Sequence, residues 1–354
     1  MMPFKVTGAP AEILTPGVQR GRAHAARVSW YSPAMQYTQL GRSGLVVSRI
    51  ALGCMSYGNP QWRPWVLRAG DAMPFYRRAV EAGINFFDTA DMYSQGVSEE
   101  ITGRALREYG KRDELVIATK VHYPMGDGPN MAGLSRKHIV QGCEASLRRL
   151  GVETIDLYQI HRFDAQVPLE ETLAALELLV TQGKVRYLGA GSTASWRLMK
   201  ALALADARGL SRFVSMQNHY NLVYREEERE MLPLCREEGV GVIPWSPLAR
   251  GLLARSGPTV REDSDDLAVN LYDHPGDGAV VAANARVAAD RGVSPAETAL
   301  AWLLHQPGVV APIVGATRLE HLDTAIRAVD LQLTEDECTA LTAPYQPHAV
   351  RGWS

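Results

Sequence analysis

The feature that most constrains the fold of this chain is a regular alternation of two kinds of segment. From Met35 onward, apolar runs of four to eight residues alternate with amphipathic stretches of ten to eighteen. Most of the runs are almost wholly apolar, as expected of parallel strands that are covered on both faces. Eight strand–helix units in series, with no change in composition, predict a single (β/α)8 barrel. The expected strands are 49–53, 84–87, 114–119, 155–160, 185–190, 213–216, 240–245 and 309–314.

The segments between these strands have the 3.6-residue apolar period of surface helices. Gly83, Gly151 and Gly183 each stand where a helix should end, and glycine is the usual residue in that position. We therefore expect each of these three helices to stop there and lead into a strand. The expected helices are 71–82, 98–109, 135–150, 169–182, 194–207, 226–238 and 318–329, with one longer helical stretch at 278–305.

The structural alternative is an open, doubly wound sheet. That fold would show GxGxxG after its first strand, whereas the sequence here is GCMSYGNP. The barrel is therefore preferred. The segments 54–69, 121–134 and 251–277 follow expected strands, and the last two are too long for simple turns. Long loops on the C-terminal face of a barrel usually shape a binding site, and we expect these segments to do so.

Residues 1–36 differ in composition from the rest of the chain. They hold Lys5 and three arginines against a single acid, Glu12, and Pro10, Pro16 and Pro33 interrupt any helix. We expect residues 1–35 to be a flexible N-terminal extension, the alternative being that the true start is Met35. The expected domains are then this extension, a barrel over 36–346, and a C-terminal tail over 347–354.

Charge and cysteine content exclude several classes of function. The formal net charge of −2 gives nucleic-acid binding no electrostatic support, and no apolar run is long enough to cross a bilayer. The four cysteines are scattered without a CxxC pair or a histidine at metal-ligand spacing. We therefore expect reduced thiols, no metal, and a cytoplasmic protein. The sequence does not indicate an oligomeric state.

Polar side chains stand at the ends of three consecutive strands. Asp88 and Lys120 close the second and third strands, and His161 follows the fourth, while Tyr93 lies five residues beyond Asp88. Carboxyl ends of barrel strands converge on one mouth, so these four side chains can meet. A tyrosine with an ordinary pKa of about 10 is a poor acid at neutral pH, and a nearby ammonium would lower that pKa. A lysine, a carboxylate that orients it, and a histidine that positions a carbonyl oxygen therefore predict proton transfer to a carbonyl.

At these residues the chain resembles the aldo-keto reductase family. DTADMY matches the family's D-x-A-x-x-Y motif, and TK and IH end the next two strands, so the family's catalytic residues carry over as Asp88, Tyr93, Lys120 and His161. LGRSGLVVSRIALG at 40–53 resembles the β-hairpin that plugs the barrel bottom, followed by the first strand. The resemblance covers about residues 36–345. The residues of its motifs most closely resemble those of a bacterial branch with the YajO-type reductases.

The resemblance implies a nicotinamide cofactor bound without a Rossmann fold. It implies that Gln217 binds the carboxamide, that Trp245 stacks on the nicotinamide ring, and that Arg318 binds the 2′-phosphate of NADPH. Two parts of the implied cofactor site depart from the family pattern. Gly191 and Ser192 stand where many relatives have Ser-Asn, and His321, Thr324 and Ala325 stand at the adenine contact. The cofactor-binding residues implied in this way are Ser192, Gln217, Trp245, Ser246, Leu248, Arg250, Gly251, Gly315, Thr317, Arg318 and His321.

We also expect side chains of the mouth to contact a small carbonyl substrate. The candidates are Tyr57, Trp62, His122, Tyr123 and Arg162. The predicted function is NADPH-dependent reduction of an aldehyde or ketone to an alcohol. Two alternatives stay open: a nicotinamide-sensing interaction protein with vestigial reductase activity, and an NADP-dependent alcohol or sugar dehydrogenase. A barrel hydrolase should instead show paired carboxylates or metal ligands at strand ends, and the sequence lacks them there.

Overall fold

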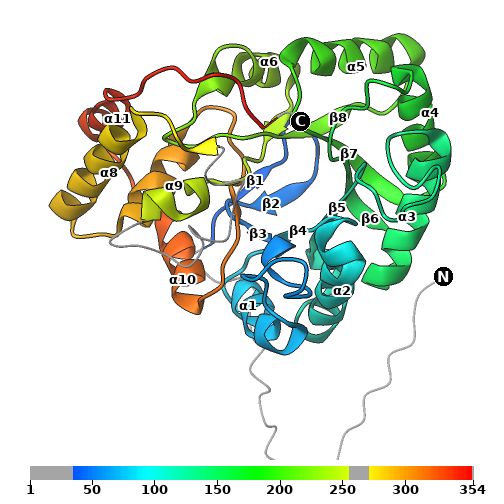
Figure 1. Ribbon diagram of the computed structural model, residues 1–354, viewed down its shortest axis with the longest axis horizontal. Coiled ribbons are helices and arrows are strands. Elements are labelled where there is room, and N and C mark those ends of the chain that lie inside the picture. Colours follow the sequence, from blue (N-terminus) through cyan, green and yellow to red (C-terminus); the bar gives the residue numbers. More distant parts are fainter. Residues whose placement is uncertain (1–34, 255–270, 353–354) are drawn as a thin grey trace, which may run out of the picture.

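Eight parallel strands form the centre of the molecule. The computed structural model describes residues 35–254 and 271–352. The strands are hydrogen-bonded in the order β10-β3-β4-β5-β6-β7-β8-β9, and a parallel bridge from Val242 to Val309 joins the two ends into a barrel (Figure 1). This confirms the predicted (β/α)8 fold. The strands are β3 (Ala51–Gly53), β4 (Phe86–Asp88), β5 (Val116–Val121), β6 (Ile155–Ile160), β7 (Val185–Gly191), β8 (Phe213–Gln217), β9 (Gly241–Val242) and β10 (Ile313–Val314).

Helices surround the strands and bury one apolar face against them (Figure 1). Gly83, Gly151 and Gly183 all have a positive φ, as the left-handed helix end requires. The helices are α1 (Ala69–Glu81), α2 (Val97–Tyr109), α3 (Arg136–Leu150), α4 (Leu169–Thr181), α5 (Ser195–Arg208), α6 (Met231–Glu238), α8 (Asp277–Arg291), α9 (Pro295–His305), α10 (Leu319–Ala328) and α11 (Glu335–Thr342). No helix in the described part of the chain is long and apolar enough to cross a membrane.

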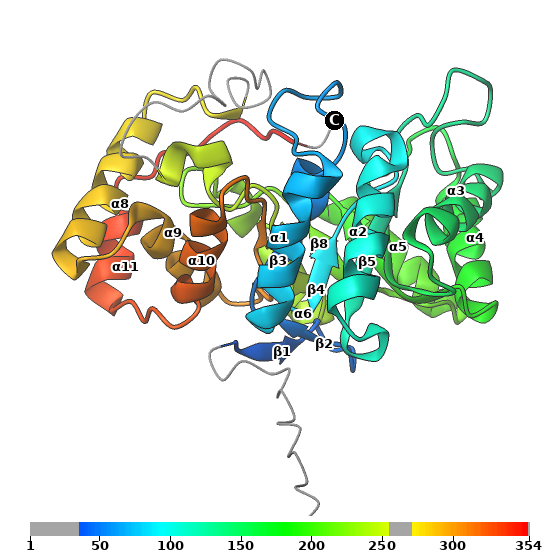
Figure 2. The ribbon, with the colours of Figure 1, turned by 90° about the horizontal axis from the view of Figure 1, so that it is seen from below.

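An antiparallel hairpin closes one end of the barrel, as predicted. It pairs β1 (Tyr37–Gln39) with β2 (Val46–Ser48), and Figure 2 shows it below the strands, with the loops that follow β3 and β5 at the opposite end. Leu40 and Val47 of the hairpin are fully buried against the apolar side chains that fill the barrel, including Phe86 and Ile243. The open end is therefore the C-terminal end of the strands.

The prediction of one helix over 278–305 is wrong. The chain forms α8 and α9 instead, because Gly292 takes a left-handed φ of 64° at the end of α8. Ser294 and Glu297 then form a capping box, and Pro295 opens α9. The helix α11, begun by a second capping box at Thr334, was not expected from the sequence.

Three expectations lie wholly or partly outside the described residues. They concern the extension over 1–35, of which only Met35 is described, residues 255–270 of the loop at 251–277, and the last two residues of the tail. The described part of the tail packs on the barrel: the amide of Arg351 donates to the hydroxyl of Tyr224 at 2.9 Å, and this hydroxyl donates back to the Arg351 carbonyl at 3.1 Å. The domain boundaries themselves stay a prediction.

Candidate active site

The structure brings the four predicted catalytic side chains together at the open end of the barrel. Lys120 Nζ lies 2.5 Å from Asp88 Oδ2 and 3.3 Å from the hydroxyl of Tyr93. The rings of Tyr93 and His161 meet edge to face, with their centroids 5.8 Å apart. One acidic, one basic and two aromatic side chains thus share a site although they come from a stretch of 74 residues, 88 to 161.

Strand register and a tight turn produce this arrangement. The parallel pairing sets Asp88 beside Ala118 and Lys120 beside Gln159, so successive strands end at similar heights. Tyr93 begins a short 3₁₀ segment, Tyr93–Gly96, in which Ser94 and Gln95 have positive φ values of 50° and 54°. This left-handed turn reverses the chain before α2 and places the Tyr93 hydroxyl over Lys120.

Asp88 accepts more hydrogen bonds than the sequence predicted. Besides Lys120, the side-chain amides of Gln159 and Gln217 each donate to Asp88 Oδ1 at 2.9 Å. Lys120 in turn also donates to the carbonyl of Thr89 at 2.8 Å. Both oxygens of the Asp88 carboxylate therefore accept hydrogen bonds, and the Lys120 ammonium is held by its bonds to Asp88 and to the Thr89 carbonyl. Gln159 was missed; its signal is a polar residue within the apolar run IDLYQI, two residues before His161 and so on the same side of the strand.

The charges of the site follow from burial and from the Asp88–Lys120 ion pair. Burial alone would lower the pKa of Lys120, but the negative charge of Asp88 and the bond to Tyr93 raise it above its ordinary value. Burial raises the pKa of Tyr93. The charge of Lys120 lowers this pKa, as the sequence predicted, but by less than burial raises it, so the pKa of Tyr93 lies above its ordinary value. Burial, with the positive charges of Lys120 and Arg162, holds the pKa of His161 well below its usual range. At neutral pH the site therefore has a charged lysine, a protonated phenol and a neutral imidazole.

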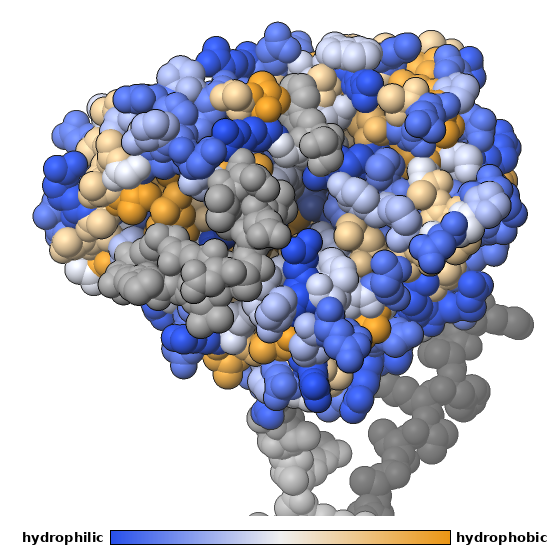
Figure 3. Space-filling view, in the orientation of Figure 1, coloured by the Kyte–Doolittle hydropathy of each residue, from blue (hydrophilic) through white to orange (hydrophobic). Residues whose placement is uncertain are grey.

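A cavity of about 940 Å³ opens at this end of the barrel, with Asp88, Tyr93 and His161 in its wall. A hollow is visible near the centre of the molecular face in Figure 3. Lys120 does not line it, since it lies behind Tyr93 and is only 1% exposed. From the predicted substrate pocket the lining includes Trp62, Tyr123 and Arg162.

Apart from Ser192, the predicted cofactor residues also line this cavity. They follow the last two strands: Trp245, Ser246, Leu248, Arg250 and Gly251 come after β9, and Gly315, Thr317, Arg318 and His321 come after β10, while Gln217 ends β8. The backbone turns left-handed at Ser246, at Arg250 and at Gly251, where φ reaches 104°. A Cβ at Gly251 would meet no atom within 4 Å, so the main chain there is open to the cavity.

Besides Lys120, three predicted residues do not line the cavity. Tyr57 is fully buried and belongs to the apolar core, because its ring packs against Phe75 and Tyr76 of α1. His122 packs edge-on against Tyr123, with ring centroids 5.0 Å apart, and lies behind it. Ser192 is buried, and its hydroxyl accepts a hydrogen bond from Trp245 Nε1 at 2.9 Å.

The packing of β7 on β6 explains one departure from the family pattern. A Cβ at Gly191 would lie 2.1 Å from the carbonyl oxygen of His161, so no side chain fits there. Residues that the sequence did not single out also line the cavity, and they come from loops and from the C-terminal segment: Met55, Ser56, Arg63, Trp65, Met92 and Gly352.

Comparisons with known proteins match this chain to one family of oxidoreductases. Residues 49–345 match the model of the Aldo/keto reductase family. The chain is 42% identical over 340 residues to versiconal hemiacetal acetate reductase of Aspergillus parasiticus, an alignment that covers 89% of this chain and 98% of that protein. It is 41% identical to an aldo-keto reductase of Fusarium vanettenii, covering 90% and 94% of the two chains. It is also 42% identical to a Schizosaccharomyces pombe protein that carries an aryl-alcohol dehydrogenase name, covering 92% and 99%.

These three relatives are fungal. None of them supports the bacterial YajO-type branch that the residues of the motifs suggested. The branch therefore stays a prediction.

Proposed function

The chain belongs to the aldo/keto reductase family and is an NAD(P)-dependent oxidoreductase, and from this premise we propose that it reduces an aldehyde or a ketone with NADPH. The observation that carries the proposal is the Tyr93 hydroxyl, 3.3 Å from Lys120 Nζ, in the wall of the same cavity as Arg250 and Arg318. A proton donor and a pair of cations suited to phosphates thus share one cavity.

In the proposed reaction Tyr93 gives its proton to the carbonyl oxygen. The raised pKa of Tyr93 keeps the phenol protonated at neutral pH, and the adjacent Lys120 ammonium stabilises the phenolate that remains after transfer. Asp88 holds Lys120 in place and charged. His161, kept neutral by burial, has one N–H with which it can orient the carbonyl oxygen.

The cavity fits a nicotinamide dinucleotide. When bound, the cofactor supplies the hydride that attacks the carbonyl carbon. The Trp245 ring offers a flat surface for stacking and is held in place by two contacts. His219 stacks on it with centroids 4.4 Å apart, and its indole N–H donates a hydrogen bond to the Ser192 hydroxyl. Arg250 and Arg318 would bind phosphate groups, and a second arginine suits the additional phosphate of NADPH. We therefore propose NADPH over NADH.

We further propose an aromatic aldehyde as the substrate class. Trp62 and Tyr123 line the cavity beside the proton donor, with the Trp62 ring centroid 6.1 Å from that of Tyr93 and the Tyr123 centroid 4.9 Å from that of His161. Aromatic walls favour an aromatic ligand through offset and edge-to-face contacts. The aryl-alcohol dehydrogenase name of one relative agrees with this class.

The proposal is tested by NADPH oxidation with 4-nitrobenzaldehyde in the wild type and in Tyr93→Phe. We expect turnover in the wild type to fall by about 10²–10⁴-fold in the variant, which is the usual contribution of a general acid. Cofactor binding, followed by fluorescence, should stay unchanged. Tyr109→Phe is the matched control, because Tyr109 ends α2 outside the cavity. Full activity in Tyr93→Phe would contradict the mechanism.

Two outcomes would favour the alternatives. Tight NADPH binding without turnover on any carbonyl would indicate the nicotinamide-sensing protein. Faster turnover of benzyl alcohol with NADP⁺ than of benzaldehyde with NADPH would indicate a dehydrogenase, the direction in which one relative is named. Replacing NADPH by NADH in the same assay decides the cofactor preference.

A further inference from the structure

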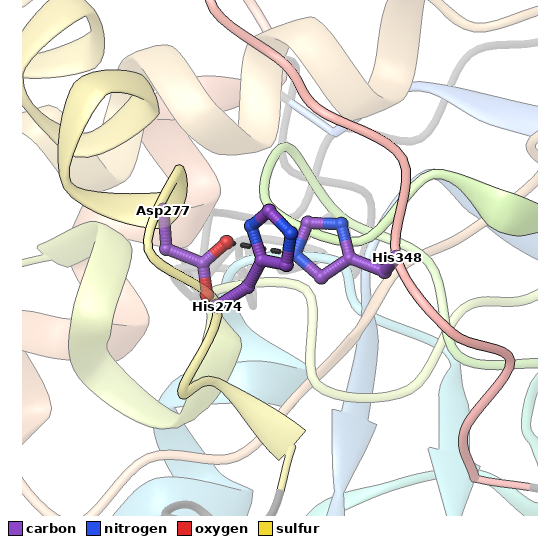
Figure 4. A group of neighbouring side chains, drawn as sticks. All are labelled: His274, Asp277 and His348. Atoms are coloured by element: carbon purple, nitrogen blue, oxygen red, sulfur yellow. Dashed lines mark hydrogen bonds and ion pairs between the residues drawn. The ribbon is translucent and has the colours of Figure 1, made fainter.

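Two histidines and an aspartate meet outside the proposed active site. His274 and Asp277 lie at the start of α8, and His348 lies in the segment that follows α11 (Figure 4). One possible ligand atom from each side chain lies within 4.8 Å of the other two. His348 Nε2 is 2.8 Å from Asp277 Oδ1, and the centroids of the two imidazole rings are 4.2 Å apart.

The cluster contains polar atoms that the described residues do not satisfy. The side chains of His348 and Asp277 are only 3% and 7% exposed. Among residues 35–254 and 271–352, His348 Nδ1 and Asp277 Oδ2 have no hydrogen-bond partner, although both atoms are buried. Buried polar atoms are nearly always paired, so each unpaired atom needs an explanation. An ion held by both oxygens of the Asp277 carboxylate would pair Oδ2.

We propose that His274, Asp277 and His348 form a binding site for a divalent metal ion of the Zn²⁺ class. Two imidazole nitrogens and one carboxylate are a ligand set that zinc uses with a water molecule in its fourth position. Ligands about 2.1 Å from a tetrahedral ion lie roughly 3.3 Å apart, so the 2.8 Å contact between His348 and Asp277 would lengthen by about half an ångström. The set contains two nitrogen ligands, which disfavours Mg²⁺ and Ca²⁺.

The surroundings of the cluster resemble the support that metal ligands usually have. Glu226 accepts hydrogen bonds from the amide of His348 and from the hydroxyl of Tyr345, both at 2.7 Å. The Tyr345 ring stacks on His348 with centroids 5.3 Å apart. These contacts fix the backbone and the ring of His348, as the supporting partners of a metal ligand usually do.

The proposed ion would fasten the C-terminal segment beside the cofactor part of the cavity. An aromatic series leads from the cluster to the cavity wall: His348 meets Tyr224, Tyr224 stacks on His219, and His219 stacks on Trp245. Gly352 lines the cavity, and a Cβ at this residue would lie 3.0 Å from the Trp245 ring. The proposed metal site is not part of the proposed reaction. Through these contacts a bound ion would hold the C-terminal segment and the Trp245 ring in place in the cofactor pocket.

The test is metal binding by the full chain after removal of metals with a chelator. We expect calorimetry to show one strong Zn²⁺ site per chain, with Mg²⁺ giving no heat, and Co²⁺ to give visible absorption bands when it binds. Zn²⁺ affinity should fall at least tenfold in His348→Gln and in Asp277→Asn. His305→Gln is the matched control and should bind Zn²⁺ like the wild type, since the hydrogen bonds of His305 within the described part of the chain go to Ala301 of its own helix and to Gln332.

Thermal unfolding of the wild type keeps the test valid if a variant folds poorly. Zn²⁺ should raise the Tm of the metal-free wild type and of His305→Gln, but not that of His348→Gln. Absence of Zn²⁺ binding by the wild type, or equal binding by His348→Gln, would overturn the proposal and leave a His348–Asp277 hydrogen bond alone. Neither readout depends on turnover, so such a failure would not bear on the reductase proposal.

Discussion

At the scale of single residues, Asp91 has the most unusual environment in the DTADMY motif. It is 1% exposed, and its Oδ1 accepts a hydrogen bond from the amide of Met92 at 2.6 Å. Its Oδ2 is buried without a partner among the described residues. Burial, and then the charge of Glu99, raise the pKa of Asp91 from 3.8 to about 8. Asp91 is therefore protonated in the folded protein at neutral pH, whereas Asp88, three residues earlier, accepts hydrogen bonds from Lys120, Gln159 and Gln217.

This environment predicts that Asp91→Asn stabilises the protein. Between the ordinary pKa of 3.8 and the folded value of about 8, the folded wild type holds a proton that the unfolded chain releases, so wild-type stability falls as the pH rises. Asparagine keeps the acceptor for Met92 and cannot ionise. The difference in free energy of unfolding should widen in favour of the variant by up to ~1.4 kcal/mol per pH unit. Urea unfolding of both proteins at several pH values in this range measures it, and a difference that does not change with pH would contradict the account.

At the scale of elements, the close approach of β7 to β6 controls the position of His161. A Cβ at Gly191 would lie 2.1 Å from the His161 carbonyl oxygen and 2.8 Å from that of Ile160. Gly191→Ala should therefore force the strand ends apart, lower stability by about 1–3 kcal/mol and reduce kcat/KM for the carbonyl, because His161 moves. Gly44→Ala is the control, since its Cβ would meet nothing within 4 Å. Equal stability and kinetics of the two variants would show that the strands can separate freely.

The order of the elements could be predicted from the sequence, but some of their limits could not. Apolar runs without alternation are enough to indicate buried parallel strands. The division of 278–305 into two helices depends on three residues, Gly292, Ser294 and Pro295, within a segment whose apolar pattern continues across the break. The signals for a helix end and a capping box are present in the sequence, but the apolar period that runs through them indicates one continuous helix.

At the scale of the whole molecule, barrel closure assembles the candidate site. Once the fold is known, strand-end residues such as Lys120 and His161 must face one mouth, so their meeting could be predicted. The side chains that loops contribute could not, because their direction depends on packing: Tyr57 turns into the core, whereas Trp62, five residues later, lines the cavity. The sequence does not predict that Gly352 lines the cavity, for a similar reason. It depends on how the C-terminal segment returns across the barrel to Tyr224.

The burial of two histidines gives the whole molecule a predictable sensitivity to acid. His219 is fully buried between the rings of Tyr224 and Trp245, and burial, with the charge of Arg250, holds its pKa well below the usual range. His161 is lowered in the same way. Below about pH 6.5 the unfolded chain binds protons at both residues and the folded protein does not, so stability is lost as the pH falls.

Each such histidine adds up to ~1.4 kcal/mol per pH unit to this loss. His219→Phe keeps an aromatic ring in the stack and removes one of the two titrations, so it should reduce the slope of unfolding free energy against pH by up to ~1.4 kcal/mol per unit below about pH 6.5. The variant also loses the hydrogen bond to Tyr272, which lowers its stability at every pH and leaves the slope unchanged. Urea unfolding of both proteins between about pH 7 and about pH 5 measures these slopes, and a wild-type slope in His219→Phe would mean that His219 takes up its proton without unfolding.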